Sequence, residues 1–297
     1  VIDGTTEPDF AGTPVVVLDG SGGALQGLEI AASGSTVRGL VIERFAQRGI
    51  LVDAGAANTR IVGNYIGTDV SGLLARGNGA WGIDLVAAGS GTVIGGTTSA
   101  DRNVIGANTG WGGIAINGTP AATVTGNYIG VGADGVTALG NGIGVYLFNA
   151  TAGSRIGGTA AGEGNLIGYN ATGIAVQSAG SQAAILGNRY VANSGQAIDL
   201  GWDGVALAND TGDGDTGANG LQNFPVFVLA RSDGSSLLSL TGSFNSLAST
   251  AFRVEFYATP VNGGANGSGE SLRYLGSVDV LTDAAGNAPL AVGLGAL

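Results

Sequence analysis

The strongest constraint on this chain is that its sequence repeats itself at an interval of 62 or 63 residues. Gly63–Gly67 reads Gly-Asn-Tyr-Ile-Gly and recurs 63 residues later as Gly126–Gly130. Between these copies, Ile94–Thr97 reads Ile-Gly-Gly-Thr and recurs 62 residues later as Ile156–Thr159. A repeat of this length predicts a stacked array, in which each repeat is one unit of supersecondary structure.

Each repeat contains two smaller rungs, and each rung carries three short strands. An apolar-x-apolar triplet, whose alternate side chains point to opposite faces, marks the first strand. This triplet occurs seven times, at Leu28/Ile30, Ile50/Val52, Ile83/Leu85, Ile114/Ile116, Val145/Leu147, Ile174/Val176 and Ile198/Leu200, with Val15–Leu18 expected as an earlier copy. Second strands are expected around Val37, Ile61, Ile94, Val124, Ile156 and Ile185, and third strands around Ile42, Ile66, Ile105, Ile129 and Ile167.

Three strands per turn, separated by glycine-rich bends, predict an all-β fold, a right-handed parallel β-helix of about seven to eight rungs. Each rung would bury its aliphatic side chains against the rungs above and below. The 58 glycines lack the strict third-residue period of collagen, so they favour many turns rather than a triple helix.

An asparagine column is expected between the second and third strands. Asparagine tolerates a left-handed bend, and stacked amides can hydrogen-bond along a column. The alternative, that these residues are ligands, is less favoured because turn asparagines usually have a structural role. The column consists of Asn64, Asn103, Asn127, Asn165 and Asn188, with Leu40 at the same place in the first rung.

The composition changes after Leu200, which predicts three parts. Residues 1–200 are expected to form the β-helix, residues 201–223 an acidic Asp- and Gly-rich linker, and residues 224–297 a small β-sandwich. About five strands are visible in the last part, fewer than the seven of an immunoglobulin-like domain. Either the sandwich is truncated, or its missing strands come from elsewhere. The abrupt opening at Val1 likewise indicates a piece of a longer protein.

The linker contains the best candidate for a metal site. Closely spaced carboxylates and amides with intervening glycines can place several hard oxygens around one Ca²⁺. The spacing does not fit an EF-hand, because Thr211 stands where the first Asp should be and no Glu closes the loop. The competing interpretation is a solvated acidic linker. The candidate ligands are Asn209, Asp210, Asp213, Asp215 and Asn219.

The charge and composition disfavour several function classes. A net charge of −11, with 11 arginines and no lysine, argues against a nucleic-acid partner. The absence of histidine and cysteine excludes zinc sites and histidine-dependent triads. The sequence contains no run of about 18 continuous apolar residues, so it does not predict a membrane-spanning segment.

Catalysis on a β-helix would need charged groups gathered on one outer strand face. The middle residue of each first-strand triplet is expected to point outward, where Glu29 and Asp84 stand two rungs apart with Leu51 between them. At about 4.8 Å per rung they would be about 9.6 Å apart, at or beyond the limit for an inverting carboxylate pair. The full outward column is Glu29, Leu51, Asp84, Ala115, Tyr146, Ala175 and Asp199.

Aromatic residues lie at or beside the first strands. An exposed row of aromatic rings could stack on sugar rings, although rings that only cover the ends of rungs are the simpler interpretation. These residues are Trp81, Trp111, Tyr146 and Trp202.

The motifs resemble bacterial right-handed β-helix repeats of very large surface or secreted, adhesin-like proteins. The resemblance rests on Gly63–Asp69, Ala138–Gly142, Ile94–Thr97 and Asn103–Ile105 in the rungs and on Val254–Ala258 in the sandwich segment. It covers nearly the whole chain and implies an adhesive or scaffold role outside the cell. Pectate lyases share the fold, but their calcium-carboxylate and arginine constellation is not visible in the outward column.

Three functions are therefore kept open. The first is a non-catalytic extracellular or cell-surface structural or adhesive module that binds polysaccharide or another surface component and is stabilised by calcium. The second is a polysaccharide lyase or glycoside hydrolase that uses the outer face of the β-helix. The third is a self-associating subunit of a surface filament or layer, in which strand edges pair between copies.

Overall fold

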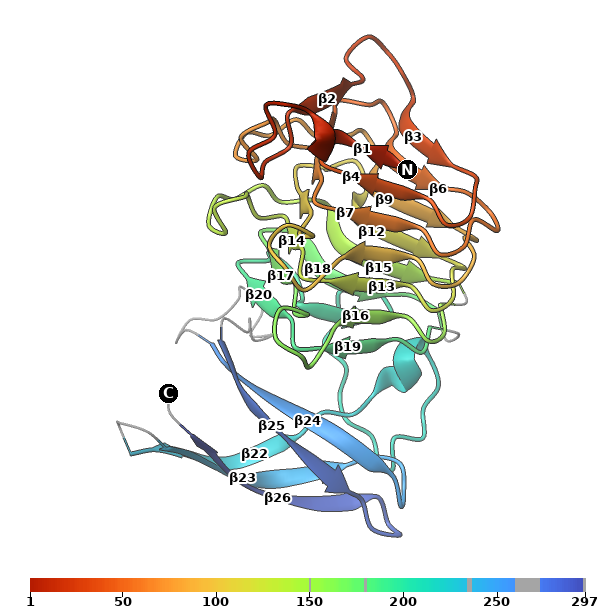
Figure 1. Ribbon diagram of the computed structural model, residues 1–297. Helices are drawn as coiled ribbons and strands as arrows, with labels where there is room; N and C mark the ends of the chain where they lie inside the picture. The colour runs from red at the N-terminus through yellow and green to blue at the C-terminus, as the bar shows by residue number, and fades with distance from the viewer. Residues whose placement is uncertain (150, 179–180, 234–236, 260–272, 296–297) are drawn as a thin grey trace.

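The computed structural model describes the 297-residue chain except residues 150, 179–180, 234–236, 260–272 and 296–297. Its first 200 residues form three parallel sheets of seven strands each, wound as a stack of rungs (Figure 1). This confirms the predicted parallel β-helix. Among the described residues, no helix has the length and apolar character needed to cross a bilayer.

The three sheets collect the three strands of every rung. The first-strand sheet contains β3 (Gln26–Ile30), β6 (Arg48–Val52), β9 (Trp81–Val86), β12 (Gly112–Asn117), β15 (Ile143–Phe148), β18 (Thr172–Val176) and β21 (Ile198–Leu200). The second-strand sheet contains β1 (Ile2–Asp3), β4 (Thr36–Arg38), β7 (Arg60–Val62), β10 (Val93–Gly95), β13 (Thr123–Thr125), β16 (Arg155–Gly157) and β19 (Ala184–Leu186). The third-strand sheet contains β2 (Val16–Asp19), β5 (Leu40–Glu43), β8 (Tyr65–Ile66), β11 (Val104–Ile105), β14 (Tyr128–Ile129), β17 (Leu166–Gly168) and β20 (Arg189–Val191).

The interior is made of aliphatic columns in register. Ile50 pairs with Ile83 and Ile83 with Ile114, and all three side chains are fully buried. The second-strand column is built in the same way, with Ile94 paired to Ile61 on one side and Val124 on the other. Because each side chain packs mainly on the equivalent residues one rung away, the sequence repeat is the direct cause of the fold.

One strand assignment from the sequence is wrong. Val15–Leu18 was expected to be an early first strand, but β2 pairs with β5 and belongs to the third-strand sheet. Three short elements therefore precede the first complete rung, which is β3, β4 and β5: they are β1, the 3-10 turn η1 (Gly4–Thr6) and β2. The apolar alternation of β2 alone does not distinguish a first strand from a third.

The predicted asparagine column forms a continuous buried ladder. Asn103 Nδ2 donates to Asn127 Oδ1 at 2.9 Å, and Asn127 Nδ2 donates to Asn165 Oδ1 at 3.0 Å. The expected left-handed conformation of these asparagines is wrong; at three of the five positions the preceding glycine adopts it instead, namely Gly63 (φ 63°), Gly126 (φ 66°) and Gly187 (φ 62°). The first asparagine ladder comprises Asn64, Asn103, Asn127, Asn165 and Asn188.

A second asparagine ladder, which the sequence analysis missed, follows the third strands. Asn108 Nδ2 donates to Asn141 Oδ1 at 3.1 Å, and the backbone N–H of Asn108 donates to the same oxygen at 3.0 Å. The signal was present in the recurring Gly-Asn-Gly at Gly77–Gly79 and Gly140–Gly142. The second asparagine ladder comprises Asn78, Asn108, Asn141, Asn170 and Asn193.

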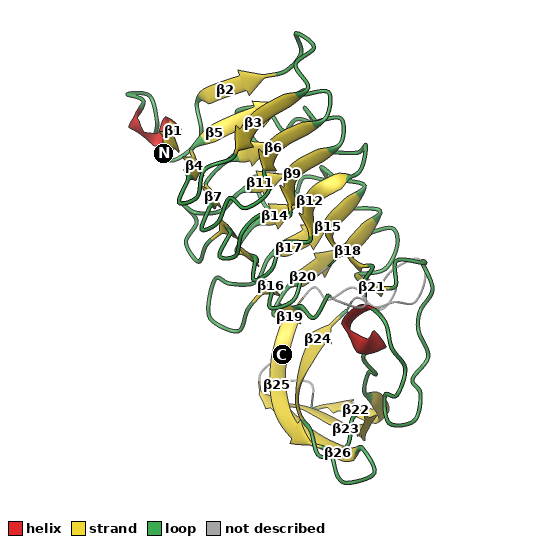
Figure 2. Cartoon of the chain, turned by 90° about the vertical axis from the view of Figure 1, so that its right-hand side faces the viewer, coloured by secondary structure: helices red, strands yellow, loops and turns green. Residues whose placement is uncertain are grey.

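The chain after the solenoid forms two small antiparallel sheets at its lower end (Figures 1 and 2). One sheet contains β22 (Val226–Ser232), β23 (Leu237–Asn245) and β26 (Asn287–Gly295), and the other contains β24 (Ala251–Ala258) and β25 (Arg273–Leu281). They share an apolar core of Leu240, Val254, Phe256 and Leu294. Residues 201–223 connect them to the solenoid and contain one 3-10 turn, η2 (Ala218–Leu221).

Candidate functional site

The acidic linker brings three of the five proposed metal ligands together. Carboxylate oxygens of Asp210, Asp213 and Asp215 lie within 4.8 Å of one another. The other two make different contacts: Asn209 exchanges hydrogen bonds with the backbone of Phe224, and Asn219 exchanges hydrogen bonds with the backbone of Ala183 in the last rung. Sequence spacing found the acidic cluster but could not show that the amides fasten the linker to its neighbours.

The three carboxylates differ in their surroundings. Asp213 is buried and accepts hydrogen bonds from Gln222 Nε2, Ser246 Oγ and the backbone N–H of Asn223. Asp210 Oδ1 is buried without a hydrogen-bond partner, while Asp215 is exposed. Desolvation raises the pKa of Asp215, and its two acidic neighbours raise it further. Three clustered hard oxygen donors of this kind fit the ligand preference of Ca²⁺.

The predicted outward column of the first-strand sheet exists in the predicted register. Leu51 pairs with Asp84, Asp84 with Ala115, and Ala115 with Tyr146. Most of this face is not solvated, however: Asp84 is only 4% exposed and Ala115 is fully buried. Aromatic rings from the strands and their flanking loops cover it.

We call these rings the aromatic strip, which consists of Trp81, Trp111, Tyr146, Phe148 and Trp202. The ring centroids of Trp111 and Trp81 are 6.3 Å apart, those of Trp81 and Tyr146 5.9 Å, and those of Tyr146 and Trp202 4.9 Å. Phe148 stacks on Tyr146 at 4.7 Å. Trp81 and Tyr146 are buried against the sheet, whereas Trp111 and Trp202 remain 57% and 38% exposed.

Small residues beneath the rings allow the strip to lie close to the sheet. Gly112 pairs with Trp81 one rung away, and a Cβ atom on Gly112 would lie 2.4 Å from the Trp81 ring. Ala115 and Ala175 occupy the column on either side of Tyr146 and are both fully buried. The alternation of large and small residues along the column therefore packs the rings against the sheet.

A hollow of about 710 Å³ opens beside the aromatic strip. Four of the five strip residues line it, together with the polar side chains of Gln47, Arg48, Asp84, Asn117 and Gln177. Ring faces with a few convergent polar groups are the usual composition of a ligand site. This hollow is the candidate functional site.

One ion pair lies in the hollow. Arg48 Nε donates to Asp84 Oδ2 at 2.6 Å. Burial raises the pKa of Asp84, although Arg48 opposes that rise. Asp84 is the only carboxylate among the described residues that line the hollow. A pair of carboxylates, as hydrolysis of a glycosidic bond requires, is therefore not assembled there by the described residues.

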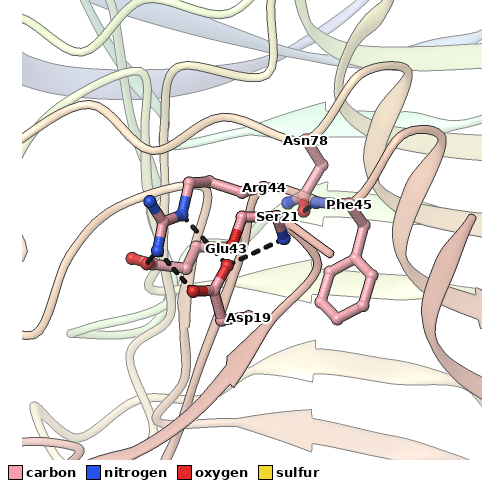
Figure 3. Close-up of polar contacts among 6 residues, drawn as sticks. All are labelled: Asp19, Ser21, Glu43, Arg44, Phe45 and Asn78. Atoms are coloured by element: carbon pink, nitrogen blue, oxygen red, sulfur yellow. Dashed lines mark hydrogen bonds and ion pairs between the residues drawn. The ribbon is translucent and has the colours of Figure 1, made fainter. Parts of the chain in front are cut away.

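A second cluster of charges lies at the N-terminal end of the third-strand sheet (Figure 3). Asp19 and Glu43 are paired across β2 and β5, and Arg44 forms ion pairs with both. The pKa of Asp19 is lowered by the backbone N–H of Ser21 and by Arg44, while desolvation raises the pKa of buried Glu43. Next to it, Asn78 Oδ1 accepts from the backbone N–H of Phe45, so the second ladder begins here. The cluster ties the first two rungs together.

Asp199 ends the outward column and is 2% exposed, with Oδ1 lacking a hydrogen-bond partner. Burial raises its pKa above the ordinary value. The folded state therefore binds this proton more tightly than the unfolded chain, and stability is lost as pH rises from the unfolded pKa through the folded one.

Replacing Asp199 with the isosteric asparagine removes this loss. We expect Asp199→Asn to be more stable than the parent by about 1 kcal/mol at neutral pH, since asparagine puts no charge at this buried position, where among the described residues only the backbone N–H of Gly204 donates to the carboxylate. Below the unfolded pKa of aspartate the two proteins should be equally stable. Urea unfolding from pH 3 to pH 8 measures this, and parallel profiles for the two proteins would contradict it.

A scan against models of protein families and a search of curated proteins gave no match to this chain.

Proposed function

We propose that the chain is a non-catalytic binding module outside the cell or on its surface, which holds a polysaccharide in the hollow beside the aromatic strip. The observation that carries this proposal is the exposed Trp111 at a hollow floored by Trp81 and Tyr146, with partly exposed Trp202 packed on the Tyr146 ring outside the lining of the hollow. Aromatic faces pack against the apolar faces of sugar rings, and polar side chains around them bind the hydroxyl groups.

The same site argues against the enzymatic alternative. Glycosidases use two carboxylates with separate roles, one as acid and one as base or nucleophile. The hollow offers Asp84 alone among its described lining residues, and Arg48 already binds that carboxylate. An adhesive or scaffolding module needs only affinity and a rigid frame, and the asparagine ladders provide the frame.

Truncating the exposed rings tests the binding role. We expect Trp111→Ala and Trp202→Ala each to weaken polysaccharide binding about tenfold, the effect of about 1.4 kcal/mol lost from a ring contact. Because both residues lie outside the strands and are partly exposed, the fold should be retained. Affinity electrophoresis in gels that contain a panel of polysaccharides provides the measurement.

Phe224→Ala is the matched control, since Phe224 is an aromatic residue 52% exposed outside the strip. It should bind like the parent. Failure of the parent to bind any polysaccharide would refute the proposal, and release of reducing or unsaturated ends would establish the enzyme instead.

We also propose that Asp210, Asp213 and Asp215 hold a Ca²⁺ ion that stabilises the junction between the solenoid and the C-terminal sheets. Asp213 is fastened to Ser246 after β23, and the neighbouring Asn219 binds Ala183 of the last rung, so an ion here would join both parts. A saturating cation at 100 times its dissociation constant would add about 2.7 kcal/mol of stability.

Thermal unfolding with Ca²⁺ and with a chelator measures this effect. We expect a higher melting temperature with Ca²⁺ for the parent and no difference for Asp215→Asn, whose exposed carboxylate has no packing role. Equal melting temperatures for the parent with Ca²⁺ and with chelator would contradict the Ca²⁺ site and favour the interpretation of residues 201–223 as a solvated acidic linker.

Two finer features of the architecture belong to the same proposal. Right-handed winding follows from the general handedness of parallel strand crossovers, which holds in about 98% of cases. We infer that the three- and two-stranded C-terminal sheets are part of a β-sandwich, because their apolar faces share one core. Membership of the bacterial β-helix repeat family is consistent with both.

A further inference from the structure

We propose that the hollow selects an uncharged polysaccharide, and that this polymer lies along the solenoid axis across several rungs. This inference rests on the proposed binding function and adds to it the chemical class and the direction of the ligand. It is based on three features: the ion pair between Arg48 and Asp84, the hydrogen bonds that orient the amide side chains of the hollow, and the direction in which the aromatic strip runs.

The cationic side chain that lines the hollow, Arg48, is already paired and is not available to bind the carboxylates of an acidic polymer. Arg48 is bound to Asp84 through Nε and to Gln47 Oε1 through Nη1. The chain has no lysine to add a positive charge, and acidic Glu29 stands two places from Asp84 in the same column. A string of carboxylates would therefore meet a paired arginine and acidic neighbours, which is unfavourable.

The amides instead present neutral donors. The side-chain oxygens of Gln47, Asn117 and Gln177 accept hydrogen bonds from Arg48, Asn149 and Tyr146 respectively. Within the described part of the chain, no protein acceptor takes a hydrogen bond from their NH₂ groups. Three donors fixed in this way suit the hydroxyl and ether oxygens of a sugar chain.

The rings run along the solenoid axis rather than along a strand. Trp81 belongs to β9, Tyr146 to β15, and Trp202 follows β21. Asp84 and Asp199, at the two ends of this path, are four places apart in the column, or about 19 Å at about 4.8 Å per rung. A single sugar cannot contact the whole path, so the geometry points to a polymer.

The test compares uncharged and acidic polymers on the same protein. The probes are glucan, xylan and galactomannan on one side, and polygalacturonate and alginate on the other. We expect at least one uncharged polymer to bind about tenfold more tightly than either polyuronate, a difference of about 1.4 kcal/mol. Oligosaccharides of the preferred polymer should gain affinity from two to about four units and then level off, as the rung spacing requires.

Asp84→Asn tests the paired arginine. It leaves the Arg48 charge without its partner, so the ratio of uncharged to uronate affinity should fall at least about threefold, and the new uronate binding should weaken as salt is added. Asp9→Asn, at an exposed aspartate outside the strip, is the matched control and should keep the parent ratio.

The possible failures are distinguishable. Absence of binding to every polymer refutes the proposed function itself. If the parent binds polyuronate as tightly as uncharged polymer, the selectivity is refuted and the binding function stands. If the affinity for oligosaccharides does not depend on their length, the axial path is refuted and the binding function stands. If Asp84→Asn does not fold, the comparison on the parent protein still decides the selectivity.

Discussion

Asn127→Ala is expected to lower the free energy of unfolding of the solenoid by about 3–5 kcal/mol, since five buried hydrogen bonds depend on one side chain. Asn127 Oδ1 accepts from the backbone and side-chain amides of Asn103, and Nδ2 donates to Ile94, Thr125 and Asn165. Alanine would leave those partners buried and unpaired, which costs more than the bonds themselves contribute.

Equilibrium unfolding in urea, followed by circular dichroism, measures the loss. Asn149→Gly is the control, because Asn149 is exposed, its side chain makes a single hydrogen bond, to Asn117, and its φ of 59° suits glycine without strain. The control should stay within about 1 kcal/mol of the parent. If Asn127→Ala is equally mild, then water replaces the amide and the ladder does not hold the rungs together.

Gly130→Ala should lower the free energy of unfolding about as much as Asn127→Ala, for a steric reason. Gly130 has φ +80°, and a Cβ atom there would lie 2.0 Å from the carbonyl oxygen of Gly168 and 2.4 Å from Asn170 Oδ1. Neither atom can retreat easily, because one is backbone in the next rung and the other belongs to the second ladder. We expect a loss of about 4 kcal/mol or more, of which only about 1–2 kcal/mol comes from the left-handed backbone.

Gly34→Ala separates the two contributions. Gly34 has a similar φ of +71° but no atom within 4 Å of a Cβ placed there. Its alanine variant should therefore lose only the backbone part, about 1–2 kcal/mol. Equal losses in the two variants, measured by the same urea unfolding, would show that the close approach of neighbouring rungs at Gly130 does not limit stability.

Much of the fold could be predicted from the sequence because each rung repeats the same local requirement. Ile83 must pack on Ile50 in the rung before it and on Ile114 in the rung after it. The alternation of apolar residues along each first strand therefore predicts both the core residues and the register between rungs. Partial rungs lack this mutual support. The strand Val16–Asp19 has no preceding partner in its sheet, and its place could not be fixed from its own residues.

The candidate site was only partly predictable. The outward column and the Asp210–Asp215 cluster follow from spacing along a strand or a short loop. The covering of Ala115 does not, because it depends on the directions taken by the rings of Trp81 and Tyr146, which pack over it from the two neighbouring rungs. Ring orientation is set by contacts between rungs, and spacing within a rung carries no information about it.

The asparagine ladders also bear on how the protein ages. Asn78 and Asn141 each precede a glycine, the context in which an asparagine side chain most readily cyclises onto the following backbone nitrogen and loses its amide. In the second ladder each amide oxygen is held by a neighbouring rung and each amide nitrogen donates in turn, so the rotation that cyclisation requires is blocked. Asn78 and Asn141 should therefore keep their amides in the folded stack and lose them faster once the chain unfolds.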